Sequence, residues 1–175
     1  MLEQLWAPIV AVTAAHDGRE NGLISSTTVT ASLLPEAPRI VVQLSATNLT
    51  HDLVRASGAF AVHFLPDDAR GLELFRALGT QTGRETSKLD DVATVPGETG
   101  APILQDAVAY VEARVAAMHA GEDSTLVVAD VVAGARVRNA SVLTIEAVRE
   151  RLPPEWAKEW DLRLEAELAA ARRRR

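Results

Sequence analysis

The chain has 175 residues, 47% of them hydrophobic and 24% charged, and it contains no cysteine. This length suits one domain with a sizeable core, and the lack of cysteine excludes disulfide frameworks, thiolate metal sites and cysteine nucleophiles and favours a reducing cytoplasm. The net charge is −6 although four arginines form the tail 172–175, so the rest of the chain would repel a nucleic acid. The apolar stretch 5–15 is short and contains Pro8, so it predicts a buried strand, not a signal peptide or a membrane span.

The first third of the chain predicts three strands. Apolar and β-branched residues fill 9–14, and the polar turn 16–18 joins this strand to a second one over 24–33. After two prolines, a third strand covers 39–45.

Short helices and further strands follow. Asn48 and Thr50 supply cap chemistry for the first helix, and Gly58 ends it. In chain order we expect a helix over 52–57, a strand over 60–64, an amphipathic helix that opens at 66–68, a mostly irregular segment over 79–100, strands over 108–118, 125–133 and 142–145, and a helix after Pro154.

The overall pattern is mainly β. Six or more strands with only short helices between them favour an antiparallel barrel or sandwich over a doubly wound sheet. In the last helix, large apolar residues recur every four positions and form one stripe: Trp156, Trp160, Leu164 and Leu168.

The common catalytic signatures are absent from the sequence. It has no nucleophile elbow, phosphate-binding loop, dinucleotide fingerprint or zinc-protease helix. Its histidines have no metal-ligand spacing, so we expect no metal site and interpret His63 as an ordinary buried residue of the barrel.

Three polar segments are candidates for a binding site. Residues 25–32 carry hydroxyls on both faces of a predicted strand, which indicates either a polar ligand or an exposed edge strand. Residues 47–51 collect polar side chains at a helix N-terminus, which favours a phosphate but also fits ordinary capping. Residues 83–88 form a polar loop with Lys88, one of only two lysines, which fits a ligand contact or a solvated loop.

Taken in order, these segments resemble the flavin reductase-like family, with its FMN-binding split barrel. The resemblance rests on 21–27 with 32–35, on 48–53, on 83–88 and on 100–104, and it covers about residues 5 to 150. It implies an antiparallel split β-barrel with short helices over 1–150, followed by a C-terminal helix over 151–175 that packs on the barrel or on a dimer partner.

The resemblance also implies the residues that bind the flavin. Hydroxyls of the first segment would line the ribityl chain and the ring edge, the second segment would receive the phosphate, and the third would close over it. The residues concerned are Ser25, Ser26, Thr27, Thr28 and Thr30, then Thr47, Asn48, Thr50 and His51, and finally Arg84, Ser87 and Lys88.

The implied activity is that of an oxidoreductase. It would bind FMN, or FAD as the alternative, take reducing equivalents from NAD(P)H and pass them to a small-molecule acceptor or a partner monooxygenase. The family also implies a homodimer with the flavin at its interface. Ser124 stands where the family commonly has a histidine near the nicotinamide, so a second hypothesis is a non-catalytic flavoprotein that stores FMN or transfers electrons. No nucleophile motif in the sequence supports a third hypothesis, a Ser-His-Asp hydrolase.

Overall fold

The computed structural model describes residues 9–174 of the chain. The start of the expected first domain, the beginning of the apolar stretch 5–15 and Arg175 of the tail lie outside the described residues. The strands are β1 (Val10–His16), β2 (Arg19–Ser25), β3 (Thr28–Thr30), β4 (Arg39–Ser45), β5 (Ala59–Phe64), β6 (Thr94–Pro96), β7 (Pro102–Leu104), β8 (Ala109–Ala120) and β9 (Ser124–Arg136), and the helices are α1 (Leu49–Ser57), α2 (Ala69–Gly79), α3 (Ile145–Arg151) and α4 (Pro154–Arg172).

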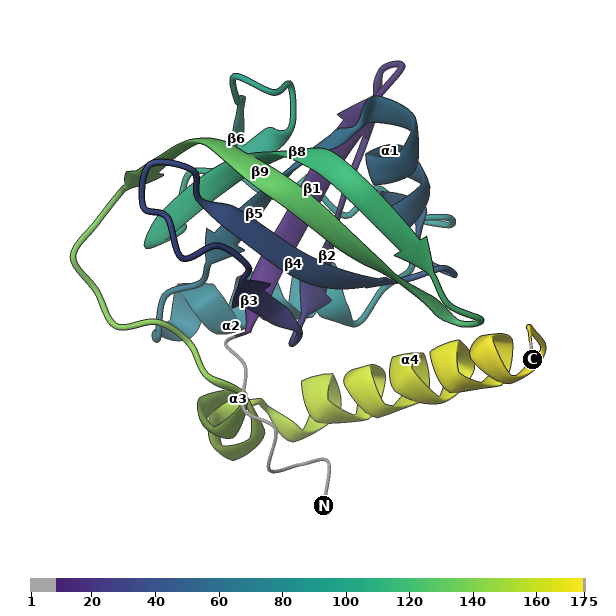
Figure 1. Cartoon of the computed structure of the whole chain (residues 1–175). Helices are drawn as coiled ribbons and strands as arrows, with labels where there is room; N and C mark the ends of the chain where they lie inside the picture. The colour runs from purple at the N-terminus through teal and green to yellow at the C-terminus, as the bar shows by residue number, and fades with distance from the viewer. Residues whose placement is uncertain (1–8, 175) are drawn as a thin grey trace.

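Seven strands form one antiparallel sheet in the order β2-β1-β5-β8-β9-β4-β3. β2 and β3 are the two edges of this sheet, yet only Ser26 and Thr27 separate them along the chain. The sheet must therefore curl until its edges meet, and the Ser25 hydroxyl of β2 donates to the Gln43 carbonyl oxygen of β4 (3.4 Å) across this seam. Figure 1 shows the curled sheet, with α1 at one end and α4 running past the other.

The first hairpin is confirmed. His16 pairs with Arg19, and the two residues between them, Asp17 and Gly18, have φ of 49° and 72°. Positive φ at both central positions gives the tight turn whose twist matches two paired strands. β1 itself is buried on both faces, which explains its unbroken apolar run.

Two apolar clusters flank β1. Val10 and Val12 point into the barrel with Phe60, whereas Ile9 and Ala11 pack on the outside. The outer cluster includes the apolar faces of α2, α3 and the start of α4, so these helices cover one side of the barrel. The sequence-predicted strand over 39–45, the amphipathic helix after Asp68 and the final helix are confirmed.

Three expectations about elements were wrong. The strand over 24–33 is interrupted at 26–27, because the chain crosses the barrel seam there and continues as the edge strand β3. The helix expected from residue 52 begins at Leu49. The expected strand over 142–145 is reduced to one bridge between Pro66 and Val142, because Thr144 caps the unpredicted helix α3 by accepting from the Ala147 N–H (3.2 Å).

The segment 79–100 is mostly irregular, as expected, but it includes β6, which pairs with β7 in a small ribbon. The turn of this ribbon covers Glu112, whose carboxylate accepts from the Thr99 N–H (2.7 Å) and the Thr99 hydroxyl (2.6 Å). Burial raises the pKa of Glu112, but these hydrogen bonds outweigh it and leave the pKa below its usual value. No helix within residues 9–174 is long and apolar enough to cross a membrane.

Candidate functional site

A pocket of about 370 Å³ lies at the seam of the barrel. Ser25, Ser26 and Thr27 line one wall, and Ser124 and Gln43 line another. The hydroxyl-rich segment is therefore the stretch of backbone at which the two sheet edges meet. Its hydroxyls border a cavity because residues 26–27 belong to neither β2 nor β3, so regular strand pairing is interrupted there.

A second pocket, of about 340 Å³, lies between the barrel and the C-terminal helices. Ser26, Asn48 and Lys88 line its barrel side, and Arg149 and Arg163 line its helical side. Three cations and the carboxylate of Glu167 line this pocket, so its net charge is positive, as a phosphate group requires.

Lys88 is almost fully buried, with 5% of the residue exposed. Its Nζ donates to the Leu78 carbonyl oxygen (2.7 Å). Burial, together with the nearby positive charge of Arg163, lowers the pKa of Lys88 to about 8. An anion beside this ammonium group would therefore be strongly favoured.

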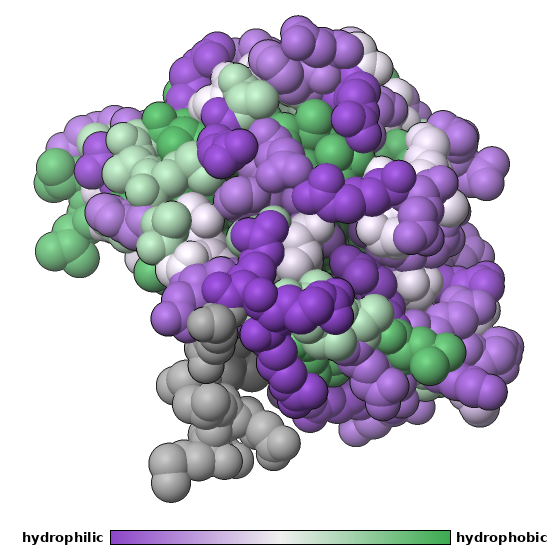
Figure 2. All heavy atoms as spheres, turned by 90° about the vertical axis from the view of Figure 1, so that its right-hand side faces the viewer, coloured by the Kyte–Doolittle hydropathy of each residue, from purple (hydrophilic) through white to green (hydrophobic). Residues whose placement is uncertain are grey.

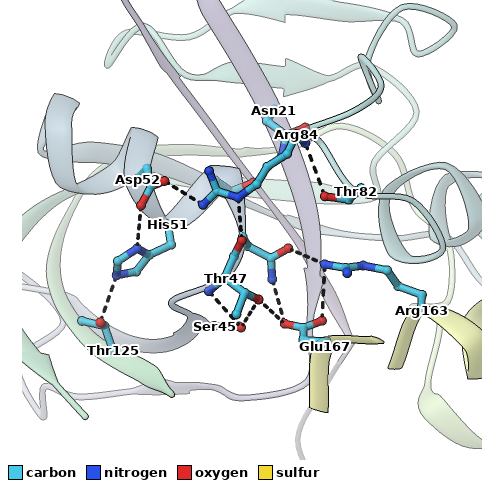
Figure 3. A network of polar contacts seen from close by, with 12 residues as sticks. Asn21, Ser45, Thr47, His51, Asp52, Thr82, Arg84, Thr125, Arg163 and Glu167 are labelled. Atoms are coloured by element: carbon cyan, nitrogen blue, oxygen red, sulfur yellow. Dashed lines mark hydrogen bonds and ion pairs between the residues drawn. The ribbon is translucent and has the colours of Figure 1, made fainter. Parts of the chain in front are cut away.

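Asn48 is the N-cap residue of α1, but its side chain makes no capping hydrogen bond. Its Nδ2 instead donates to Glu167 Oε1 (3.0 Å), and its Oδ1 accepts from Arg163 Nη2 (3.3 Å). The Thr47 hydroxyl lies 3.5 Å from the same Glu167 oxygen. Figure 3 shows this network, in which α4 meets the loop before α1.

The network continues to the other face of α1. Arg84 Nε donates to the Thr47 carbonyl oxygen (2.9 Å), and its Nη2 pairs with Asp52 (2.8 Å). His51 lies between Asp52 (3.2 Å) and the Thr125 hydroxyl (3.0 Å). Burial raises the pKa of Asp52, but hydrogen bonds from Arg84 and His51 outweigh it and leave the pKa below its usual value. The carboxylate is thus charged, and it holds the Arg84 guanidinium and the His51 ring in place (Figure 3).

The predicted residues do not all face one cavity. Ser25, Ser26, Thr27, Asn48 and Lys88 line the two adjoining pockets, and Thr47, His51 and Arg84 lie in the neighbouring network. The remaining four lie apart: Thr28 and Thr30 border an apolar groove beside β4, Thr50 is fully buried with its hydroxyl bonded to Asn21 (2.9 Å), and Ser87 donates to Asp90.

Sequence reasoning missed the contribution of the C-terminal helix. Arg163 and Glu167 are four residues apart on α4 and form a 3.7 Å ion pair. They lie three and seven positions after Trp160, which places them on the helix face that Trp160 turns to the barrel. The sequence signal that could have indicated this contribution is an oppositely charged pair, four residues apart, on the helix that carries the apolar stripe.

The donor set fits a flavin mononucleotide. A cationic pocket suits the phosphate, and the adjoining pocket supplies hydroxyls of the kind that hydrogen-bond a ribityl chain. No cluster of three or more metal-ligating side chains occurs in the described part of the chain.

Comparison with known proteins bears on the same region. Residues 2–147 match the family described as "Flavin reductase like domain". The chain is 34% identical over 134 residues to the ferric-chelate reductase (NAD(P)H) of Archaeoglobus fulgidus, covering 76% of this chain and 78% of that protein. It is 26% identical over 127 residues to HsaB, the reductase subunit of a flavin-dependent monooxygenase of Mycobacterium tuberculosis, covering 73% of this chain and 64% of that protein.

A solved structure shares the architecture. The FMN-binding protein from Thermus thermophilus superposes with a TM-score of 0.72 at 23% identity, over 84% of this chain and 86% of that chain. The mainly antiparallel split-barrel fold expected from the sequence is therefore confirmed.

Proposed function

The chain belongs to the flavin reductase-like family, and from that premise we propose that it binds FMN and transfers reducing equivalents from NAD(P)H to an acceptor. The observation that carries the proposal is the pair of adjoining pockets, one cationic and one lined by hydroxyls, along the seam of the barrel. FAD is the alternative flavin, and its larger phosphate-bearing end would enter the same cationic pocket.

In this proposal the chain's residues bind and orient the flavin. Lys88 and Asn48 bind the phosphate, and Arg84 orders the loop that carries Thr47. Ser25, Ser26 and Thr27 hydrogen-bond the ribityl chain. Bound FMN supplies the hydride chemistry, so no side chain has to act as the redox centre.

Two relatives support the electron donor and the type of acceptor. The relative from Archaeoglobus fulgidus is named for NAD(P)H as its donor, and HsaB is named as the reductase subunit of a monooxygenase. We propose NAD(P)H as the donor here, and a small molecule or a partner monooxygenase as the acceptor.

The proposal is tested on the purified protein. FMN should bind with quenching of its fluorescence, and NADH or NADPH oxidation should depend on both the protein and added FMN. Lys88→Met should weaken FMN binding by about tenfold or more, because a charge-assisted hydrogen bond is lost. Lys158→Met is the matched control, because Lys158 is the other lysine of the chain and lines neither pocket.

The second candidate is a protein that holds FMN without reducing it. The observation that favours it is Ser124, which borders the hydroxyl-lined pocket where the family commonly has histidine. Tight FMN binding without oxidation of NADH or NADPH would support this candidate. Lack of any flavin binding would contradict both.

A further inference from the structure

The cationic pocket has two walls of different origin. Its barrel wall lies within residues 2–147, which match the family, whereas Arg149, Arg163 and Glu167 come from α3 and α4 beyond that match. The family match therefore covers the barrel wall of the pocket but not these three residues.

Arg163 and Glu167 are held close to the barrel. Their side chains are 17% and 26% exposed, although no residue of α4 is fully buried. Trp160, one turn before Arg163, packs edge-on against Phe75 of α2 with ring centroids 5.1 Å apart. This contact fixes the point from which Arg163 reaches the pocket.

A second anchor fixes the same part of the helix. Arg76 of α2 binds both carboxylate oxygens of Glu159 at 2.8 Å, and its guanidinium lies 4.7 Å from the centre of the Trp156 ring. The first half of α4 is thus docked, while Leu164 and Leu168 in the second half remain 48% and 46% exposed. The second half meets the barrel through the polar side chains of Arg163 and Glu167.

Glu167 holds the groups that an incoming phosphate needs. Its Oε1 accepts from Asn48 Nδ2 (3.0 Å) and lies 3.5 Å from the Thr47 hydroxyl. A carboxylate and a phosphate present the same chemistry to these donors, which is an anionic oxygen that accepts hydrogen bonds. Two anions cannot share one small set of donors without strong repulsion.

We propose that α4 is the outer wall of the flavin phosphate site, where Arg163 binds the phosphate and Glu167 occupies Asn48 and Thr47 until the phosphate displaces it. This inference rests on the proposed flavin binding, and it adds two residues that have opposite effects on the affinity for the phosphate. Displacement leaves Arg163 free of its 3.7 Å pairing with Glu167, so the guanidinium can turn to the phosphate beside Lys88. Glu167 then opposes binding, whereas Arg163 favours it.

The experiment compares FMN with riboflavin, because the two ligands differ only in the phosphate. Dissociation constants of both are measured by flavin fluorescence for the full chain and for Arg163→Gln and Glu167→Gln. We expect Arg163→Gln to weaken FMN binding about tenfold and Glu167→Gln to tighten it about threefold or more, with riboflavin unchanged within about twofold in each. Arg172→Gln and Glu165→Gln are matched controls, since these exposed residues of α4 do not line the pocket.

Other outcomes overturn the inference. If Arg163→Gln loses affinity for FMN and riboflavin equally, α4 acts on a part of the flavin other than the phosphate. If FMN affinity is unchanged in both variants, α4 does not act on the flavin. If Arg163→Gln unfolds, as judged by circular dichroism, Arg163→Lys takes its place and should retain most of the FMN affinity that Arg163→Met loses. Wild-type protein that binds neither ligand refutes the proposed function itself, which separates that failure from a failure confined to the two variants.

Discussion

His63 is the most thoroughly buried ionisable residue in the barrel wall. Its side chain is inaccessible to solvent, Nδ1 donates to the Ala11 carbonyl oxygen (3.3 Å), and Nε2 has no hydrogen-bond partner among the described residues. Burial lowers the pKa of His63 to about 4, although the nearby Glu112 carboxylate opposes the shift. The ring is therefore neutral at pH 7.

A pH-dependent loss of stability follows for His63. Between pH 6.5 and 4 the unfolded chain binds a proton that the folded chain does not, so the free energy of unfolding falls as the pH falls through this range. At pH 4.5 the loss relative to pH 7 is about 2 kcal/mol. His63→Gln should remove this part of the pH dependence in urea titrations, whereas His119→Gln, at an exposed position, should retain it. An unchanged profile in His63→Gln would contradict the assignment.

Under the proposed function, Ser124 is the residue at which the nicotinamide side of the site would depart from the family. Its hydroxyl accepts from Gln43 Nε2 (2.9 Å) at the edge of the hydroxyl-lined pocket. We expect Ser124→His to raise NADH-dependent turnover several-fold, because the imidazole restores a positioning contact for the donor. Steady-state oxidation of NADH with saturating FMN measures this, and Ser124→Ala separates gain of the ring from loss of the hydroxyl. Absence of turnover in all three proteins, with FMN bound in each, would favour the non-catalytic hypothesis.

At the scale of elements, α4 is a helix of two unequal halves. The first half contributes Trp156 and Trp160 to the outer apolar cluster, whereas the second half meets the barrel through the polar contacts of Arg163 and Glu167. The apolar stripe seen in the sequence is thus only half used within one chain. Apolar docking contacts and polar contacts with the loop before α1 are thus separated along the same helix.

The substitution Trp160→Ala tests whether apolar packing holds the first half of α4 on the barrel. Removing the indole abolishes the edge-on contact with Phe75 and leaves a partly open gap, so the free energy of unfolding should fall by about 2 to 3 kcal/mol. Leu162→Ala, on the exposed side of the same helix, should change it by less than about 0.5 kcal/mol. Equal stability of the two variants in urea unfolding would show that the start of α4 does not depend on this packing.

At the scale of the whole molecule, the single chain leaves apolar surface uncovered. Val29, Leu33 and Leu34 are 52%, 100% and 56% exposed beside a groove of about 470 Å³ that is mostly apolar. Figure 2 shows hydrophobic side chains gathered at the left edge of a largely polar face. Apolar surface of this kind on a small barrel is typical of an interface between protein chains.

We therefore predict a homodimer that uses this surface. Light scattering at micromolar concentration with FMN present should give twice the chain mass for the wild type. The double substitution Leu33→Ser and Leu34→Ser should shift the protein toward the monomer, because it removes the most exposed leucines of the patch. Leu162→Ser on α4 is the control and should stay dimeric. A monomeric wild type would refute the prediction.

The sequence determined the elements whose stability comes from local patterning. The strand over 39–45 and the amphipathic helix after Asp68 follow from side-chain periodicity and capping, which act over a few residues. The family resemblance also lay in short motifs, so the split-barrel fold and the polar segment 25–27 could be predicted from them.

Only the tertiary structure decided how distant segments meet. Ser26 and Thr27 interrupt a strand because the two edges of the sheet come together there, and edge closure depends on all seven strands. Glu167 meets Asn48 across 119 positions of the chain, so a local pattern could mark a charged pair on α4 but not the segment that this pair meets. Periodicity identifies which face of an element is apolar, but contacts between faces arise from the packing of the whole chain, and the packing decides which polar groups line a cavity.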